Sequence, residues 1–324
     1  MTAIGGAAAA VTGAASGIGR ALAIELAARD CNLALADRDE AGLQALAAEI
    51  GGRHHVKLTT HRVDVGAPAE IAGFAQAAIT AHPALNIVIN NAGVALLGQF
   101  SEIDQAQMDW LFNINFWGTV HCTRTFLPHL ARQAEAHIVN VSSIFGIIAP
   151  PGQTAYAAAK FAVRGFSESL RHELQMAASP VRLSVVHPGG IATNIVRNSA
   201  TGVGVADNAR RVESIERFEQ VAKTTPQAAA LRIIKGIEKN QPRILIGGDA
   251  RMMDILQRLR PATYWGAAGA ADRADDQDDA IATPVTARSA GRRNRRSSCD
   301  RSPRGSTPAS PRNWHCLRRK VRPS

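Results

Sequence analysis

Residues 7–19, with the sequence AAAAVTGAASGIG, decide the fold of this chain. Residues 7–12 are an apolar run typical of a buried strand, and a helical pattern follows the glycines as far as Arg29. Gly13 lets the chain turn, Gly17 lets backbone approach a pyrophosphate, and Gly19 lets the helix pack closely. The amides and the dipole at the start of the helix attract that anion. The stretch therefore predicts a strand, a nucleotide-binding glycine turn and a helix.

The second strand predicts which dinucleotide is bound. The strand-like run 32–36, Asn-Leu-Ala-Leu-Ala, ends on Asp37, 18 residues beyond Gly19. A carboxylate there accepts hydrogen bonds from the hydroxyls of an adenosine ribose and repels a 2′-phosphate, which favours NAD over NADP. Arg38 favours NADP instead, because a guanidinium can bind that 2′-phosphate. Ser16 adds no second cation to the glycine turn, so NAD is the expected cofactor.

Further strand-like runs also end in small polar residues. Residues 56–63 lead to Asp64–Val65, whose carboxylate either meets an adenine amino group or caps the helix near Pro68. Residues 86–89 lead to Asn90–Gly93, where short side chains let a ribose approach. Helical patterns at 39–50, 68–81 and 104–133 supply the right-handed crossovers of a parallel sheet. The sequence predicts an α/β fold, a doubly wound parallel sheet of the Rossmann type.

Tyr156 and Lys160 lie four residues apart in an alanine-rich run, so a helix there places both on one face. A fixed cation beside a phenol favours the phenolate, so we expect a lowered tyrosine pKa and an acid–base group. In isolation the pair also fits a solvated lysine and a half-buried tyrosine. Ser143 lies thirteen residues upstream, at the end of the strand-like run 136–143. Ligands bind at that edge of an open α/β sheet.

Residues 190–259 predict a lid, two helices and an edge strand. Residues 190–223 are irregular and then helical from about Asn208, which we interpret as a substrate lid. A helix is expected from Pro226 to Lys239, an edge strand at 242–246 and a helix at 249–259.

Composition indicates a soluble globular protein. The 324 residues are 46% hydrophobic and 20% charged, enough for a sizeable core. No apolar run reaches the roughly 20 residues of a membrane span, and the start lacks a basic signal-peptide flank, so we expect a cytoplasmic protein. The four scattered cysteines lack metal-ligand spacing, so neither a disulfide framework nor a metal site is indicated.

The net charge of +10 is concentrated in the tail. Residues 267–324 hold 13 Lys and Arg against 6 Asp and Glu, which leaves 24 against 21 for residues 1–266. We predict one domain over 1–266 and a disordered tail over 267–324, because the tail has almost no apolar periodicity. Nucleic-acid binding through the basic run 292–296 and a frameshifted reading of the gene's end are alternative interpretations of this tail.

Together these motifs resemble the short-chain dehydrogenase/reductase family. The resemblance covers about residues 7–246 and depends on Thr12–Gly19, Asp64–Val65, Asn90–Gly93, Asn115, Ser143, Tyr156–Lys160 and Pro188–Gly189. It implies that Ser143 polarises the substrate oxygen, that Tyr156 passes the proton and that Lys160 lowers the tyrosine pKa and holds the nicotinamide ribose. It gives Asn115 the anchoring of a water in the proton relay. Asn113 competes for that last role, and Ser142 competes with Ser143.

The resemblance also implies a cofactor site. Its expected residues are Gly13, Ser16, Gly17, Ile18, Gly19, Asp37, Arg38, Asp64, Val65, Asn91, Ala92, Gly93, Tyr156, Lys160, Pro188, Gly189, Ile191 and Thr193. The Ile191 backbone and the Thr193 hydroxyl would meet the nicotinamide carboxamide.

The expected activity is reversible hydride transfer between NAD and a small or medium hydrophobic secondary alcohol or ketone. Candidate pocket residues are mostly apolar: Ile144, Phe145, Ile148, Pro150, Gln153, Ile191 and Val196. The family commonly pairs the helix at 161–176 and the long helix before it between subunits, which implies a homodimer or homotetramer. An NADP-dependent carbonyl reductase and a non-catalytic nucleotide-sensing scaffold are the alternatives.

Overall fold

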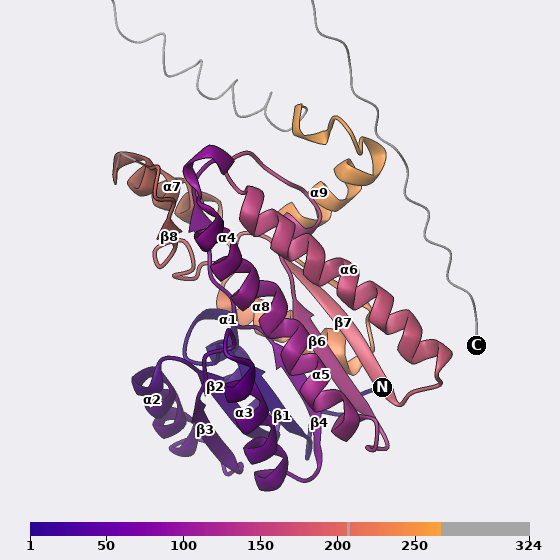
Figure 1. Ribbon diagram of the computed structural model, residues 1–324. Coiled ribbons are helices and arrows are strands. Elements are labelled where there is room, and N and C mark those ends of the chain that lie inside the picture. The colour runs from indigo at the N-terminus through magenta and orange to yellow at the C-terminus, as the bar shows by residue number, and fades with distance from the viewer. Residues whose placement is uncertain (206–207, 267–324) are drawn as a thin grey trace, which may run out of the picture. The chain divides into compact units, whose positions relative to one another are not determined.

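The computed structural model of the chain describes residues 1–205 and 208–266. Its centre is a seven-stranded sheet in the order β3-β2-β1-β4-β6-β7-β9 (Figure 1). The strands are β1 Ala8–Thr12, β2 Asn32–Asp37, β3 Leu58–Arg62, β4 Leu85–Asn90, β6 Ala136–Val141, β7 Val181–Pro188 and β9 Arg243–Ile246. All neighbours pair in parallel. The predicted doubly wound parallel sheet is confirmed.

Helices cover both faces of the sheet and bury two apolar cores. One face carries α1 Gly17–Ala27, α2 Glu40–Gly51 and α8 Pro226–Glu238, and the other carries α3 Pro68–Ala81, α5 Gly118–Leu130 and α6 Thr154–Met176. Leu22, Leu46 and Ile233 pack in the first core. Ile71 and Phe126 pack in the second. Burial on both faces explains why the strands, apart from β3 at the edge, are mostly apolar instead of alternating.

The strand order reverses between β1 and β4. The chain proceeds outward from β1 through β2 to β3, then returns to β4 and proceeds toward β9. The connections that follow β1 and β4 therefore leave the sheet on opposite faces. In open α/β sheets a ligand binds in the crevice that this divergence opens at the carboxyl ends of the strands.

The predicted helix at 104–133 is wrong as a single element. The structure divides it into α4 Gln105–Phe112, a π-helical turn at Asn113–Trp117 and α5. At the end of that turn the helix lies close to Val65, because a Cβ on Gly118 would lie 3.0 Å from the Val65 carbonyl oxygen. A π-turn shifts the helical face by one residue, and apolar periodicity does not reveal it.

Other segments match or extend the expectations. α7 begins at Asn208 and ends at Val221, and α9 covers Gly248–Leu259. Strands β5 Leu96–Leu97 and β8 Ala200–Thr201 form a small parallel pair that the sequence did not reveal. The tail predicted to be disordered, 267–324, lies outside the described residues.

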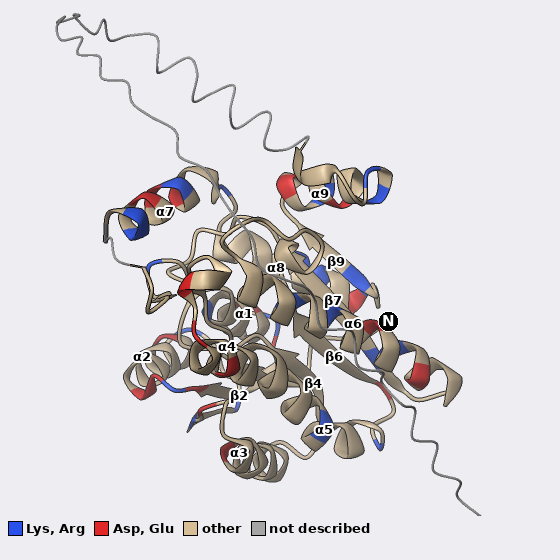
Figure 2. Cartoon of the chain, turned by 45° about the horizontal axis from the view of Figure 1, so that its top comes forward, with Lys and Arg blue, Asp and Glu red and all other residues tan. Residues whose placement is uncertain are grey.

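Helix α7 carries charged residues of both signs along its length (Figure 2). Across residues 1–205 and 208–266, no helix combines the length and the apolar character needed to cross a bilayer.

Candidate active site

The glycine turn after β1 has the packing that its sequence predicts. Gly13 has φ +67°, and a Cβ on Gly13 would lie 2.8 Å from the Ala92 Cα. A Cβ on Gly19 would lie 2.0 Å from the Gly13 carbonyl oxygen. Real Cβ atoms do not come that close, so both positions require glycine. The start of α1 therefore lies directly against the end of β4.

Thr12 and Asn91 connect the glycine turn to β4. The Thr12 hydroxyl accepts hydrogen bonds from the backbone amides of Asn91 at 3.1 Å and Ala92 at 3.2 Å. The Asn91 side-chain amide donates to the carbonyl oxygens of Thr12 and Gly13 at 3.0 and 3.1 Å. The Asn91 side chain thus holds the glycine turn against the end of β4.

The first turn of α1 presents free amides. Ser16 is the N-cap residue, yet its side chain makes no capping hydrogen bond, and the first turn carries no acidic residue. Gly17 has φ +53°, and Ile18 follows it half-buried. The described residues thus leave unsatisfied donors at the positive end of a helix dipole, where a pyrophosphate fits.

Asp37 lies beside this turn at the end of β2. Its Oδ2 accepts a hydrogen bond from the Ala15 amide at 2.9 Å, and its Oδ1 accepts one from the Asp39 amide at 3.0 Å. A carboxylate has about four acceptor positions, so it can still accept ribose hydroxyls. Arg38 is exposed. The two residues that bear on the choice between NAD and NADP therefore lie next to each other.

Asp64 does not cap α3. Its Oδ1 accepts from the Gly66 amide at 2.8 Å, whereas Ala67 is the N-cap residue before Pro68. The Asp64 side chain is exposed, and Val65 is buried next to it. The structure thus favours the adenine-side interpretation of Asp64 over the helix cap.

Tyr156 and Lys160 share one face of α6, as their spacing predicts. The Lys160 Nζ lies 5.6 Å from the centre of the Tyr156 ring and donates to the Val141 carbonyl oxygen at 3.1 Å. Lys160 is only 3% exposed. A Cβ on Gly93 would lie 3.4 Å from Lys160 Nζ and 3.1 Å from the Asn115 Oδ1. The tyrosine, the lysine and the asparagine therefore converge on the end of β4.

The pKa values correct one expectation. Burial raises the pKa of Tyr156 to about 12, and hydrogen bonding by Ser143 offsets this only in part. Burial lowers the pKa of Lys160 to about 8. The predicted lowering of the tyrosine pKa by Lys160 is therefore wrong for this structure. Removal from water disfavours the charged form of each group, and it is the largest cause of both shifts.

The two serines at the end of β6 have different partners. Ser142 is buried, and its hydroxyl donates to the Lys160 carbonyl oxygen at 2.8 Å. Ser143 is half-buried, and its hydroxyl accepts from the Phe145 amide at 3.1 Å. Phe145 packs edge-on against Tyr156 at 6.1 Å between ring centres. Ser143 thus faces the tyrosine, and the geometry favours it over Ser142 as the substrate-binding hydroxyl.

The two asparagines of the π-turn also separate. Asn115 is fully buried, and its side-chain amide exchanges two hydrogen bonds with the Val94 backbone at 2.8 and 2.9 Å. Asn113 instead donates to the Gly66 carbonyl oxygen at 2.8 Å. Asn115 therefore belongs with the Lys160 group, and Asn113 belongs with the loop after β3.

The loop after β7 differs in part from expectation. Ile191 is buried and packs in the first core with residues of α8, and its pocket-lining role stays a prediction. The backbone of Ile191 still belongs to this loop: its carbonyl oxygen accepts a hydrogen bond from the Thr193 amide at 2.7 Å. Sequence reasoning missed Asp249, whose Oδ2 accepts the Gly190 amide at 2.7 Å. No spacing in the sequence relates Asp249 to Pro188–Gly189.

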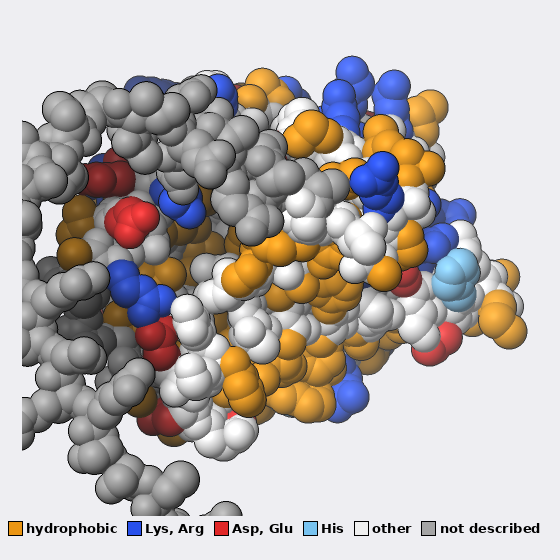
Figure 3. Space-filling model, turned by 90° about the horizontal axis from the view of Figure 1, so that it is seen from above, with side chains coloured by type: hydrophobic (Ala, Val, Ile, Leu, Met, Phe, Trp, Pro, Cys, Tyr) orange, Lys and Arg blue, Asp and Glu red, His pale blue; other side chains and the backbone are white. Residues whose placement is uncertain are grey.

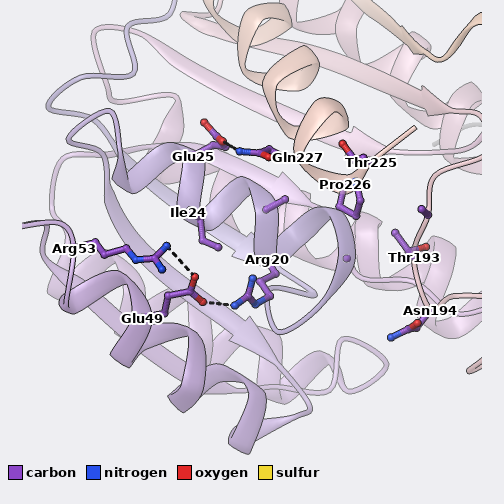
Figure 4. Close-up of a pocket in the computed structure, with 13 residues that line it drawn as sticks. Arg20, Ile24, Glu25, Glu49, Arg53, Thr193, Asn194, Thr225, Pro226 and Gln227 are labelled. Atoms are coloured by element: carbon purple, nitrogen blue, oxygen red, sulfur yellow. Dashed lines mark hydrogen bonds and ion pairs between the residues drawn. The ribbon is translucent and has the colours of Figure 1, made fainter. Parts of the chain in front are cut away.

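A cavity of about 460 Å³ lies on the outer side of Gly17 and Thr193. Arg20 and Arg53 share the carboxylate of Glu49 along one wall (Figure 4). The cavity does not include Ser143, Tyr156 or Lys160. It is therefore separate from the acid–base group.

The glycine turn, the strand-order reversal and the Ser143–Tyr156–Lys160 group define a dinucleotide-dependent dehydrogenase-type α/β protein. The family model for short chain dehydrogenase matches residues 7–203. The chain belongs to this family, and it is an NAD(P)-dependent oxidoreductase.

Similar proteins support the same family. The chain is 39% identical to a putative oxidoreductase SadH of Mycobacterium tuberculosis over 265 residues, 82% of this chain and 94% of that protein. It is 34% identical to an uncharacterized oxidoreductase YxnA of Bacillus subtilis, over 78% of this chain and 68% of that protein. A short chain dehydrogenase/reductase from Burkholderia phymatum in complex with NAD matches with a TM-score of 0.73 and 28% identity. That match covers 80% of this chain and 95% of that one.

Proposed function

We propose that this protein transfers a hydride between NAD(H) and a hydrophobic secondary alcohol or ketone of small to medium size, with Tyr156 as the acid–base group. The observation that carries the proposal is the convergence of Tyr156, Lys160 and Asn115 beside Gly93, at the reversal of the strand order. A buried amine next to a half-buried phenol is costly for folding, and such perturbed groups cluster at catalytic sites.

Each residue has a distinct part in the proposed reaction. The nicotinamide ring, when bound, supplies the hydride chemistry. In the reduction direction, Ser143 donates a hydrogen bond to the carbonyl oxygen, and the Tyr156 phenol passes its proton to that oxygen. The phenol is protonated at neutral pH because burial raises its pKa to about 12. Lys160 then returns a proton to the tyrosine, through a water that Asn115 would anchor.

The substrate class follows from the surroundings of Tyr156. Phe145 packs against the tyrosine, and Ile148 is buried nearby in the chain. Viewed onto the end of the molecule that carries α9, hydrophobic side chains form much of the surface (Figure 3). A phenol that packs against the Phe145 ring, with the Ser143 hydroxyl beside it, suits a hydrophobic carbonyl compound better than a carboxylate or a phosphate.

NAD is proposed in preference to NADP because Asp37 lies at the ribose end of the glycine turn. Its carboxylate already bonds the Ala15 amide, so it is fixed where a 2′-phosphate would be repelled. The exposed Arg38 supports the alternative of an NADP-dependent reductase. Titration with NADH and with NADPH separates the two, and tighter NADPH binding would contradict this choice.

The proposed lid, within 190–223, is tied to α4. The Gln107 side chain donates to the Thr201 carbonyl oxygen at 2.8 Å and accepts from the Val203 amide at 3.1 Å. These bonds lie beside the small β5–β8 pair. A segment held by such exposed contacts opens at little cost, as a lid requires.

A homodimer or homotetramer and a cytoplasmic location complete the proposal. Trp117, the last residue of the π-turn before α5, is 46% exposed, and Phe161 on α6 is 38% exposed; an oligomer would bury both side chains. Cys31 and Cys122 are buried free thiols, as in a reducing compartment.

The test is a panel of hydrophobic secondary alcohols incubated with NAD, with NADH formation followed by absorbance. We expect turnover by the natural protein and none by Tyr156→Phe, which keeps the ring but loses the proton. NADH binding, followed by fluorescence, should be the same in both. Full turnover by Tyr156→Phe would refute the acid–base role. NADH binding without turnover on any alcohol or ketone would instead favour the nucleotide-sensing scaffold.

A further inference from the structure

His187 is a buried histidine that the reaction scheme does not use. It is fully buried near the end of β7, directly before the Pro188–Gly189 loop. Its Nδ1 lies 2.9 Å from the carbonyl oxygen of Ser143. A carbonyl oxygen only accepts hydrogen bonds, so the neutral ring carries its proton on Nδ1 and donates it.

The Ser143 carbonyl oxygen has two donors. The Gly146 amide donates to it at 2.9 Å from within the short turn after β6, and His187 donates from the neighbouring strand. The Ser143 hydroxyl in turn accepts the Phe145 amide at 3.1 Å. The His187 ring on β7 therefore holds the Ser143 carbonyl oxygen, and the Gly146 amide in the turn after β6 holds the same oxygen.

The surroundings of His187 keep its ring neutral. Burial lowers its pKa to about 4, and the cations of Arg243 on β9 and Arg164 on α6 act in the same direction. The hydrogen bond to the Ser143 carbonyl oxygen and the Glu168 carboxylate on α6 raise the pKa but do not overcome burial. Arg243 is itself paired with Asp254 of α9 at 2.6 Å. Within the described residues the Nε2 of His187 has no hydrogen-bond partner, so the ring is held through Nδ1.

We propose that His187 is a positioning residue that holds the Ser143 backbone, and thereby the Ser143 hydroxyl, at the distance from Tyr156 that proton transfer requires. The inference rests on the proposed function of Ser143. His187 directly precedes Pro188–Gly189 and the loop that carries Ile191 and Thr193. It therefore also fixes the substrate-binding hydroxyl of Ser143 relative to that loop. Misplacement of a reacting group by about 1 Å costs up to about 100-fold in rate.

Three substitutions of His187 separate this role from general packing. An asparagine amide nitrogen stands at the same bond count from Cα as the histidine Nδ1, so His187→Asn can still donate to Ser143. The glutamine amide reaches one atom further, so His187→Gln loses the contact. We expect kcat to fall about 10- to 100-fold in His187→Gln and His187→Ala, with NADH affinity unchanged and with recovery in His187→Asn.

A double-mutant cycle tests whether His187 acts through Ser143. In a Ser143→Ala background the additional loss from His187→Ala should disappear, because the hydroxyl that it positions is already gone. His137→Ala is the matched control. His137 is equally buried but lies at the opposite end of the sheet, so its loss should lower stability and leave kcat unchanged. Additive losses in the cycle, or failure of His187→Asn to recover, would overturn the proposal.

A second readout does not depend on turnover. Displacement of Ser143 weakens the hydrogen bond from the Phe145 amide, so hydrogen exchange at that amide should be faster in His187→Ala than in His187→Asn. Equal exchange in the two variants would overturn the positioning role. If the natural protein oxidises no alcohol, the proposed function fails, and the exchange measurement still decides the role of His187.

Discussion

Lys160→Met should stabilise the folded protein while abolishing its activity. Burial holds the pKa of Lys160 at about 8, against an ordinary value of 10.5. At about 1.4 kcal/mol per unit, this difference corresponds to about 3 kcal/mol of free energy of unfolding, by which the buried charge destabilises the fold. Methionine has a similar length and helix propensity and carries no charge. It loses the hydrogen bond to Val141, about 1 kcal/mol, so the net gain is about 2 kcal/mol at neutral pH.

The effect of Lys160→Met has a defined pH dependence. Below about pH 8 the natural lysine is charged in both the folded and the unfolded state, and the full destabilisation is present. Between about pH 8 and pH 10.5 the folded state loses its proton first. The unfolded state then binds more protons, so the stability of the natural protein rises with pH and the advantage of the variant shrinks. Above that range the lysine is neutral in both states and the advantage is gone.

Urea unfolding followed by circular dichroism, at about pH 7 and about pH 10, measures this difference. Tyr156 and the buried thiols are present in both proteins, so their alkaline titration largely cancels in the comparison. Lys160→Arg is the control, because arginine stays charged over the whole range and should show no such rise in stability with pH. The reasoning is refuted if Lys160→Met is no more stable than the natural protein near neutral pH, or if its advantage does not change with pH.

Three further predictions concern the ribose end of the cofactor site, the packing of the glycine turn and the exposed aromatic surface. Asp37→Ala removes the carboxylate beside the glycine turn, so NADH affinity measured by fluorescence should fall about 10-fold while NADPH affinity rises. An equal loss for both cofactors would contradict the assignment. Gly19→Ala brings a Cβ within 2.0 Å of a carbonyl oxygen of the turn, and it should cost more than about 2 kcal/mol of unfolding free energy and abolish NADH binding. Gly73→Ala is its control, since the space there is open. Combined Trp117→Lys and Phe161→Lys should yield a monomer in analytical ultracentrifugation, and an unchanged mass would exclude this surface as the interface.

Local signals in the sequence predicted most of the fold. Pro68 and the Thr225 cap mark helix starts, and the structure begins α3 at Pro68 and α8 directly after Thr225. Polar residues at strand ends predicted which segments meet, because all parallel strands end at one edge. The π-turn at 113–117 and the β5–β8 pair were missed. The first adds no periodicity, and the second involves only two residues on each strand.

Contacts between distant segments set the limit of sequence reasoning at the site. Ser143 and Tyr156 are separated by a fixed spacing, whereas His187 and Asp249 reach the site only through the pairing of β6, β7 and β9. Neither residue belongs to a local motif, so no pattern singles it out. Such supporting residues become visible when the hydrogen bonds of each site residue are traced to their partners.

The pKa values show why the identity of a catalytic pair is easier to predict than its charge. The spacing of Tyr156 and Lys160 fixes that they are neighbours, and Coulomb attraction between phenolate and ammonium alone would lower the tyrosine pKa. Burial acts on both groups in the opposite direction, and its size depends on how the π-turn and the end of β4 close around them. The free site therefore holds a neutral phenol and an amine that loses its proton near pH 8.

A bound anion at the start of α1 would favour the charged lysine, so cofactor binding should raise the pKa of Lys160. Proton uptake on NADH binding, measured by calorimetry in buffers of different ionisation enthalpy near pH 8, would show this coupling. Binding without proton uptake would show that the two sites titrate independently.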